Sequence, residues 1–85
     1  NRREAQFLLA RCFQAKGFPD LARKEYNHAL EGAPQNDERA KEILYNLGAL
    51  AEAENDSAAA RAYYSRVFEV DIGYRDVAQK MERFR

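Results

Sequence analysis

The chain repeats itself at a constant offset, equal to the separation along the sequence between Glu4 and Glu42. This repetition constrains its fold more than any other feature. Identical residues recur at this repeat offset, among them Glu4 and Glu42, Leu9 and Leu47, Ala22 and Ala60, and Tyr26 and Tyr64. Self-similarity with a period of about 20 to 50 residues is typical of stacked supersecondary units. We therefore expect an array of similar units, an architecture that mostly binds other molecules.

Apolar residues recur at three- and four-residue spacing, which predicts helices. The first expected helix runs from about Arg3 to Lys16, and the second from Pro19 to before Gly32. The third runs from a cap at Asn36 or Asp37 to about Glu54. The fourth runs from the turn Asn55-Asp56-Ser57 to Asp71, and the fifth from about Tyr74 to Phe84. No segment alternates with period two, so no strand is expected. The prediction is an all-α chain of five helices.

Composition excludes several classes of function. The 85 residues suffice for one small domain, and 14 basic residues balance 14 acidic ones, so the surface lacks the excess positive charge that nucleic acid or an anionic membrane would require. Cys12 is the single cysteine, so no internal disulfide or multi-cysteine metal site is expected. We find no apolar run of about 20 residues, and neither a catalytic nor a cofactor-binding motif.

The chain begins with Asn1 rather than Met, and we therefore expect a fragment of a longer protein. No signal peptide is visible. The sequence leaves the compartment open, and we favour the cytoplasm.

The repeat also matches a specific motif, W-x2-L-G-x2-Y followed by A-x3-F and then P. The first copy reads Gln6, Leu9, Ala10, Phe13, Ala22, Tyr26, Pro34, and the second reads Leu44, Leu47, Gly48, Ala51, Ala60, Tyr64, Ile72. Over about residues 3 to 74 the chain therefore resembles the tetratricopeptide repeat (TPR) family. Gln6, Ala51 and Ile72 depart from the pattern.

The resemblance implies antiparallel helix pairs stacked into a short right-handed superhelix. A small residue, Ala10 or Gly48, would face Ala22 or Ala60 where two helix backbones approach closely. The repeat offset exceeds the family's period of about 34 residues, which we interpret as one extra helical turn or, alternatively, a longer loop. We expect a single domain over 1–85, with repeat 1 at about 3–36, the inserted turn at about 37–40, repeat 2 at about 41–74 and a capping helix at about 75–85. Glu82 stands where the next small residue would fall, which favours a cap.

The resemblance further implies a protein or peptide partner bound on a concave face lined by the first helix of each repeat. On this basis the expected peptide-binding residues are Phe7, Arg11, Tyr45, Asn46 and Lys80. Phe7 and Tyr45 recur at one position and would form an exposed anchor pair. The alternative is that both rings pack between helices.

Two other functions stay open. One is self-association, because about three repeats are usually needed for stability, and the first helix could stack on a second copy or on upstream repeats. The other is a regulatory domain of a larger enzyme. Within the chain itself we expect no catalytic residue, since His28 has no partner at a diagnostic spacing.

Overall fold

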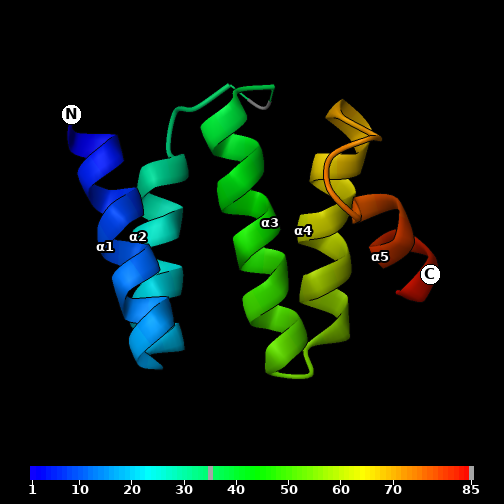
Figure 1. Ribbon diagram of the computed structural model, residues 1–85, viewed down its shortest axis with the longest axis horizontal. Helices are drawn as coiled ribbons and strands as arrows, with labels where there is room; N and C mark the ends of the chain where they lie inside the picture. Colours follow the sequence, from blue (N-terminus) through cyan, green and yellow to red (C-terminus); the bar gives the residue numbers. More distant parts are fainter. Residues whose placement is uncertain (35, 85) are drawn as a thin grey trace. The chain divides into compact units, whose positions relative to one another are not determined.

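The computed structural model describes residues 1–34 and 36–84. These residues form five α-helices in the order α1 to α5 and contain no strand (Figure 1). The predicted all-α class and the five helices are thus confirmed. The chain divides into two compact units, residues 1–33 (unit 1) and 34–85 (unit 2).

Unit 1 is a helix pair, α1 (Arg2–Lys16) and α2 (Pro19–Leu30). The side chain of Asn1 caps α1 by accepting a hydrogen bond from the backbone N–H of Glu4 at 3.1 Å. Gly17 ends α1 with a φ of 86°, a left-handed conformation that glycine adopts without a steric penalty. Pro19 stands in the first turn of α2, where its missing N–H costs no helical hydrogen bond. The predicted boundary between the two helices is therefore confirmed.

The core of unit 1 lies between α1 and α2, which pack against each other. Its fully buried residues are Phe7, Ala10, Ala22, Tyr26 and Ala29. The hydroxyl of Tyr26 donates a hydrogen bond to Oε1 of Gln14 at 2.5 Å, so the polar end of this buried side chain has a partner.

Unit 2 contains α3 (Glu38–Ala53), α4 (Ser57–Val70) and α5 (Val77–Arg83). Asp37 and Asp56 cap α3 and α4, and each accepts a hydrogen bond from a backbone N–H three residues later at 3.1 Å.

Helix α4 packs against both α3 and α5. The fully buried side chains here include Ile43, Leu44, Leu47, Ala60, Tyr64, Val67 and Val77. A Cβ atom at Gly48 would lie 2.7 Å from the ring of Tyr64. The ring of Tyr64 is therefore the nearest obstacle to a larger residue at position 48.

The fifth helix is shorter than predicted, because it begins at Val77 instead of about Tyr74. The preceding residues form turns, and Arg75 has a φ of 43° that interrupts helical geometry. Val77 is fully buried and anchors the start of α5.

Lys41 links the first turn of α3 to the segment that follows α4. Its side chain is only 9% exposed, and its Nζ lies 2.9 Å from Asp71 and 2.7 Å from Glu38. Hydrogen bonds to Glu38 and Asp71 raise the pKa of Lys41, and the bond from Lys41 lowers the pKa of Asp71. No local sequence pattern singles out this lysine, because its partner Asp71 is distant in sequence.

Candidate partner-binding surface

The two residues of unit 1 expected to bind a partner lie one above the other on α1. Phe7 is fully buried and its ring centroid lies 6.0 Å from that of Tyr26. The guanidinium of Arg11, which is exposed, lies 5.8 Å from the centre of the Phe7 ring. The expectation of an exposed aromatic at position 7 is therefore wrong, and the ring packs between α1 and α2. Arg11 covers that ring at the surface.

The equivalent aromatic in unit 2, Tyr45, is half-exposed and stands at the centre of a cluster of rings. Its ring centroid lies 5.4 Å from that of Tyr64 and 6.0 Å from that of Tyr74. Its hydroxyl donates a hydrogen bond to Asp76, just before α5. Burial and this hydrogen bond raise the pKa of Tyr45 to about 12, so the hydroxyl stays protonated at neutral pH.

Arg75 lies over this cluster, and sequence reasoning missed it. Its guanidinium is 5.1 Å from the centre of the Tyr45 ring and 5.2 Å from that of Tyr74, within range for cation–π attraction. It also lies 3.9 Å from the carboxylate of Glu42 on α3. The left-handed backbone of Arg75 is a local irregularity that no sequence pattern announces.

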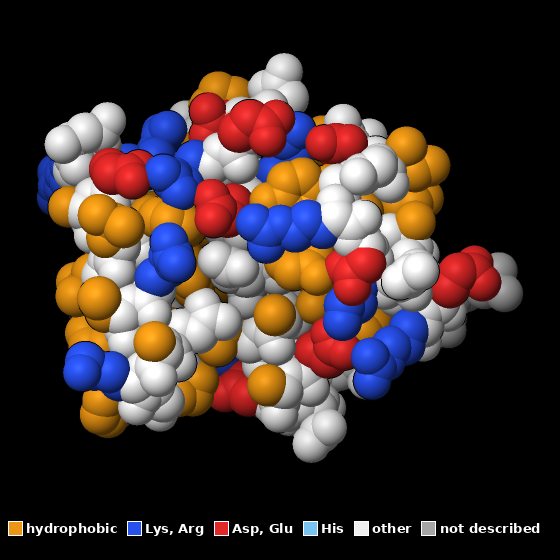
Figure 2. All heavy atoms as spheres, in the orientation of Figure 1, with side chains coloured by type: hydrophobic (Ala, Val, Ile, Leu, Met, Phe, Trp, Pro, Cys, Tyr) orange, Lys and Arg blue, Asp and Glu red, His pale blue; other side chains and the backbone are white. Residues whose placement is uncertain are grey.

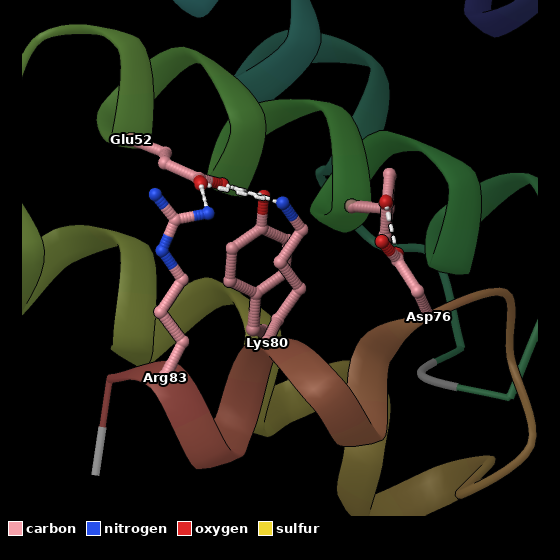
Figure 3. Close-up of polar contacts among 6 residues, drawn as sticks. Glu52, Asp76, Lys80 and Arg83 are labelled. Carbon is pink, nitrogen blue, oxygen red and sulfur yellow. Dashed lines mark hydrogen bonds and ion pairs between the residues drawn. The ribbon is translucent and has the colours of Figure 1, made fainter.

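Glu52 is the main charged link between α3 and α5 (Figure 3). Its carboxylate accepts hydrogen bonds from Lys80 at 3.0 Å and from the hydroxyl of Tyr64 at 2.9 Å, and it lies 2.8 Å from the guanidinium of Arg83. Burial opposes ionisation of this carboxyl, but the bonds from Lys80 and Tyr64 and the charge of Arg83 outweigh it and lower the pKa of Glu52.

The bond between Tyr64 and Glu52 repeats a bond of unit 1. By the repeat offset, Gln14 is the equivalent of Glu52, and it accepts the hydrogen bond of Tyr26, which is the equivalent of Tyr64. A neutral amide thus fills the position in unit 1, and a carboxylate fills it in unit 2. The extra negative charge is what allows unit 2 to bind the two cations of α5.

These contacts form one surface along α3 and α5, which we call the α3–α5 surface. It consists of Glu42, Tyr45, Glu52, Arg75, Asp76, Lys80 and Arg83. The structure thus brings two of the expected residues, Tyr45 and Lys80, onto the same surface. Asn46 follows Tyr45 on α3 and is also half-exposed. The α3–α5 surface belongs entirely to unit 2, whereas Phe7 and Arg11 belong to unit 1.

The two arginines of the α3–α5 surface are more exposed than their acidic partners. The side chains of Arg83 and Arg75 are 65% and 49% exposed, whereas Glu52 and Glu42 are 19% and 27% exposed. More widely, acidic and basic side chains alternate with apolar ones on the face drawn in Figure 2. The α3–α5 surface therefore offers guanidinium groups to an approaching ligand within a surface of mixed charge.

A tetratricopeptide repeat family model matches residues 2–72. The chain belongs to the TPR family. The match covers both helix pairs, α1 with α2 and α3 with α4, in agreement with the motif read from the sequence. A search of curated proteins finds no match to the chain.

Membership in the TPR family supports a general role in protein–protein interaction. TPR repeats are typically non-catalytic modules. Among the described residues, no cluster of histidine, cysteine, aspartate or glutamate side chains is arranged to hold a metal ion. None of the helices in the described part of this TPR chain has the length and apolar character needed to cross a membrane.

Proposed function

We propose that this TPR chain binds a segment of a partner protein on the α3–α5 surface, and that the segment carries acidic side chains. The observation that carries the proposal is the position of Arg83 and Arg75, whose guanidinium groups are the most exposed members of the ion pairs of this surface. A guanidinium can bind a carboxylate through two parallel hydrogen bonds, which gives geometric selectivity as well as affinity.

The tyrosines of the same surface supply an apolar contact beside these charges. Tyr45 is half-exposed, and its ring is held by Tyr64, Tyr74 and Arg75 on several sides. A ring held in one place loses little conformational entropy when a ligand binds, and tyrosine and arginine are enriched among residues that dominate interface energies. Tyr45, Asn46 and Lys80 therefore remain our proposed contacts, and Arg75 and Arg83 join them. Arg11 is the corresponding exposed candidate in unit 1.

The proposal is tested with a phage-displayed library of random dodecapeptides selected on the immobilised chain. We expect the selected peptides to be enriched in aspartate and glutamate, with binding that weakens as salt rises. Arg83→Gln and Tyr45→Ala should each weaken the binding of a selected synthetic peptide about fivefold or more, as measured by calorimetry.

Arg66→Gln is the matched control, because Arg66 lies on α4 outside the α3–α5 surface. Tyr45→Phe separates the role of the ring from that of the hydroxyl bonded to Asp76. Selected peptides without acidic residues would contradict the charge argument. Binding that neither Arg83→Gln nor Tyr45→Ala alters would place the site elsewhere.

A further inference from the structure

An apolar stripe on α1 lies open to solvent, although its counterpart on α3 is buried. Leu9 is 44% exposed, whereas Leu47, its equivalent by the repeat offset, is 1% exposed. The same contrast separates Ala5 from Ile43 and Cys12 from Leu50. Exposed apolar area of this kind is stabilised by burial against another surface. We call Ala5, Leu9 and Cys12 the α1 stripe.

Unit 2 carries an apolar groove of about 410 Å³ between α4 and α5. It is lined by Arg61, Phe68, Ile72, Ala78, Met81 and Glu82. Ile72 is 67% exposed, the largest exposed fraction among the large apolar side chains of the described residues. This groove lies on residues that are distinct from those of the α3–α5 surface.

The two units carry opposite net charges. Unit 1 contains six basic and four acidic residues, whereas unit 2 contains eight basic and ten acidic residues. Contact between unit 1 of one copy and unit 2 of another is therefore attractive at long range, whereas contact between like units is repulsive. The chain as a whole is neutral, so no net repulsion keeps two copies apart.

We propose that the α1 stripe of one chain docks into the unit 2 groove of a second copy of the same chain. The apolar residues of the stripe recur at helical spacing on one face, which suits a helix lying along an apolar groove. The contact joins unlike surfaces, so one stripe in one groove links two copies and leaves a second stripe and a second groove for further copies. The occupant of the groove is thus α1 of the partner copy.

The mass of the full chain is measured by sedimentation equilibrium from low micromolar to high micromolar concentration. The mass of the wild-type chain should rise with concentration to that of two copies or more. Leu9→Glu and Ile72→Glu should each weaken association by about tenfold or more, because each would bury an unpaired charge in an apolar contact. Both sites are exposed in the single chain, and circular dichroism checks that the variants fold.

Leu8→Glu is the matched control for the α1 stripe. Leu8 is 49% exposed on the same helix, but its side chain points about 100° around the helix axis from that of Leu9. Its equivalent in α3 is the polar residue Asn46. Leu8→Glu should leave association unchanged, as should Ala62→Glu on the exposed side of α4 outside the groove.

Mixing the two disruptive variants gives the sharpest test. Leu9→Glu retains an intact groove and Ile72→Glu retains an intact stripe, so an equimolar mixture should regain association through one contact. A wild-type chain that stays monomeric overturns the proposal. Association that survives Ile72→Glu also overturns the proposal, because the α1 stripe of one copy would then contact the α1 stripe of another. A mixture of the two variants that stays monomeric overturns it as well. If either variant unfolds, Leu9→Gln and Ile72→Gln repeat the same comparison.

Discussion

Replacing Glu52 by glutamine should loosen α5 while the α3–α4 pair stays folded. The substitution copies Gln14, which holds the equivalent position in unit 1 and accepts the equivalent tyrosine hydrogen bond. A glutamine at position 52 can still accept the hydrogen bond of Tyr64 and has nearly the same volume. It lacks the negative charge that Lys80 and Arg83 face.

The size of the effect follows from the exposure of the two ion pairs. The side chains of Lys80 and Glu52 are each 19% exposed, and their charged atoms lie 3.0 Å apart. Charged hydrogen bonds usually contribute about 1.5 to 3 kcal/mol. Because this one is partly solvated, it contributes about 1 kcal/mol. The side chain of Arg83 is 65% exposed and adds about 0.5 kcal/mol at most. The free energy of unfolding of unit 2 should therefore fall by about 1.5 kcal/mol at most. Such a loss lowers the melting temperature of a small domain by roughly 6 to 12 °C.

Amide hydrogen exchange locates this loss, and urea unfolding measures it. We expect faster exchange in α5, with α1 and α2 of the same chain as an internal reference that does not change. Glu52→Ala should cost more than Glu52→Gln by about 1 to 3 kcal/mol, because it also leaves the buried hydroxyl of Tyr64 without its acceptor. Unchanged exchange in α5 of Glu52→Gln would refute the reasoning that these ion pairs hold the helix.

Three further predictions concern unit 2. Gly48→Ala should destabilise it by about 1 kcal/mol in urea unfolding, since overpacking against the ring of Tyr64 exceeds the roughly 1 kcal/mol gained in helix propensity; a more stable variant would contradict this. The pKa values of Glu52 and Asp71 are lowered in the folded chain. The stability that these carboxylates contribute is therefore present above their ordinary pKa values of 4.5 and 3.8 and is lost as the pH falls below those values. Acid titration should show a shallower loss of stability for Glu52→Gln than for the wild-type chain. Asp56→Ala should cost about 1 kcal/mol in urea unfolding through loss of the α4 cap, and Asp56→Asn should be nearly neutral in the same measurement.

The sequence by itself determined the family, the fold class and most helix boundaries of this protein. These features depend on residues close together in the chain. Gly17 ends α1 through its own backbone conformation, and Asp56 caps α4 through a bond to an N–H three residues away. The repeat offset also preserves spacing, so the two helix pairs could be recognised before any contact was known.

The tertiary structure decided which of the candidate residues are exposed. Phe7 and Tyr45 hold the same position in the repeat, but Phe7 is fully buried and Tyr45 is half-exposed, because the neighbours of each ring come from other segments. Lys80 pairs with Glu52 across 28 residues, a separation at which sequence spacing gives no information about contact. The left-handed turn at Arg75 places its guanidinium over Tyr45. Local patterns thus determined the helices, whereas packing between distant residues decided which side chains are buried and which are exposed.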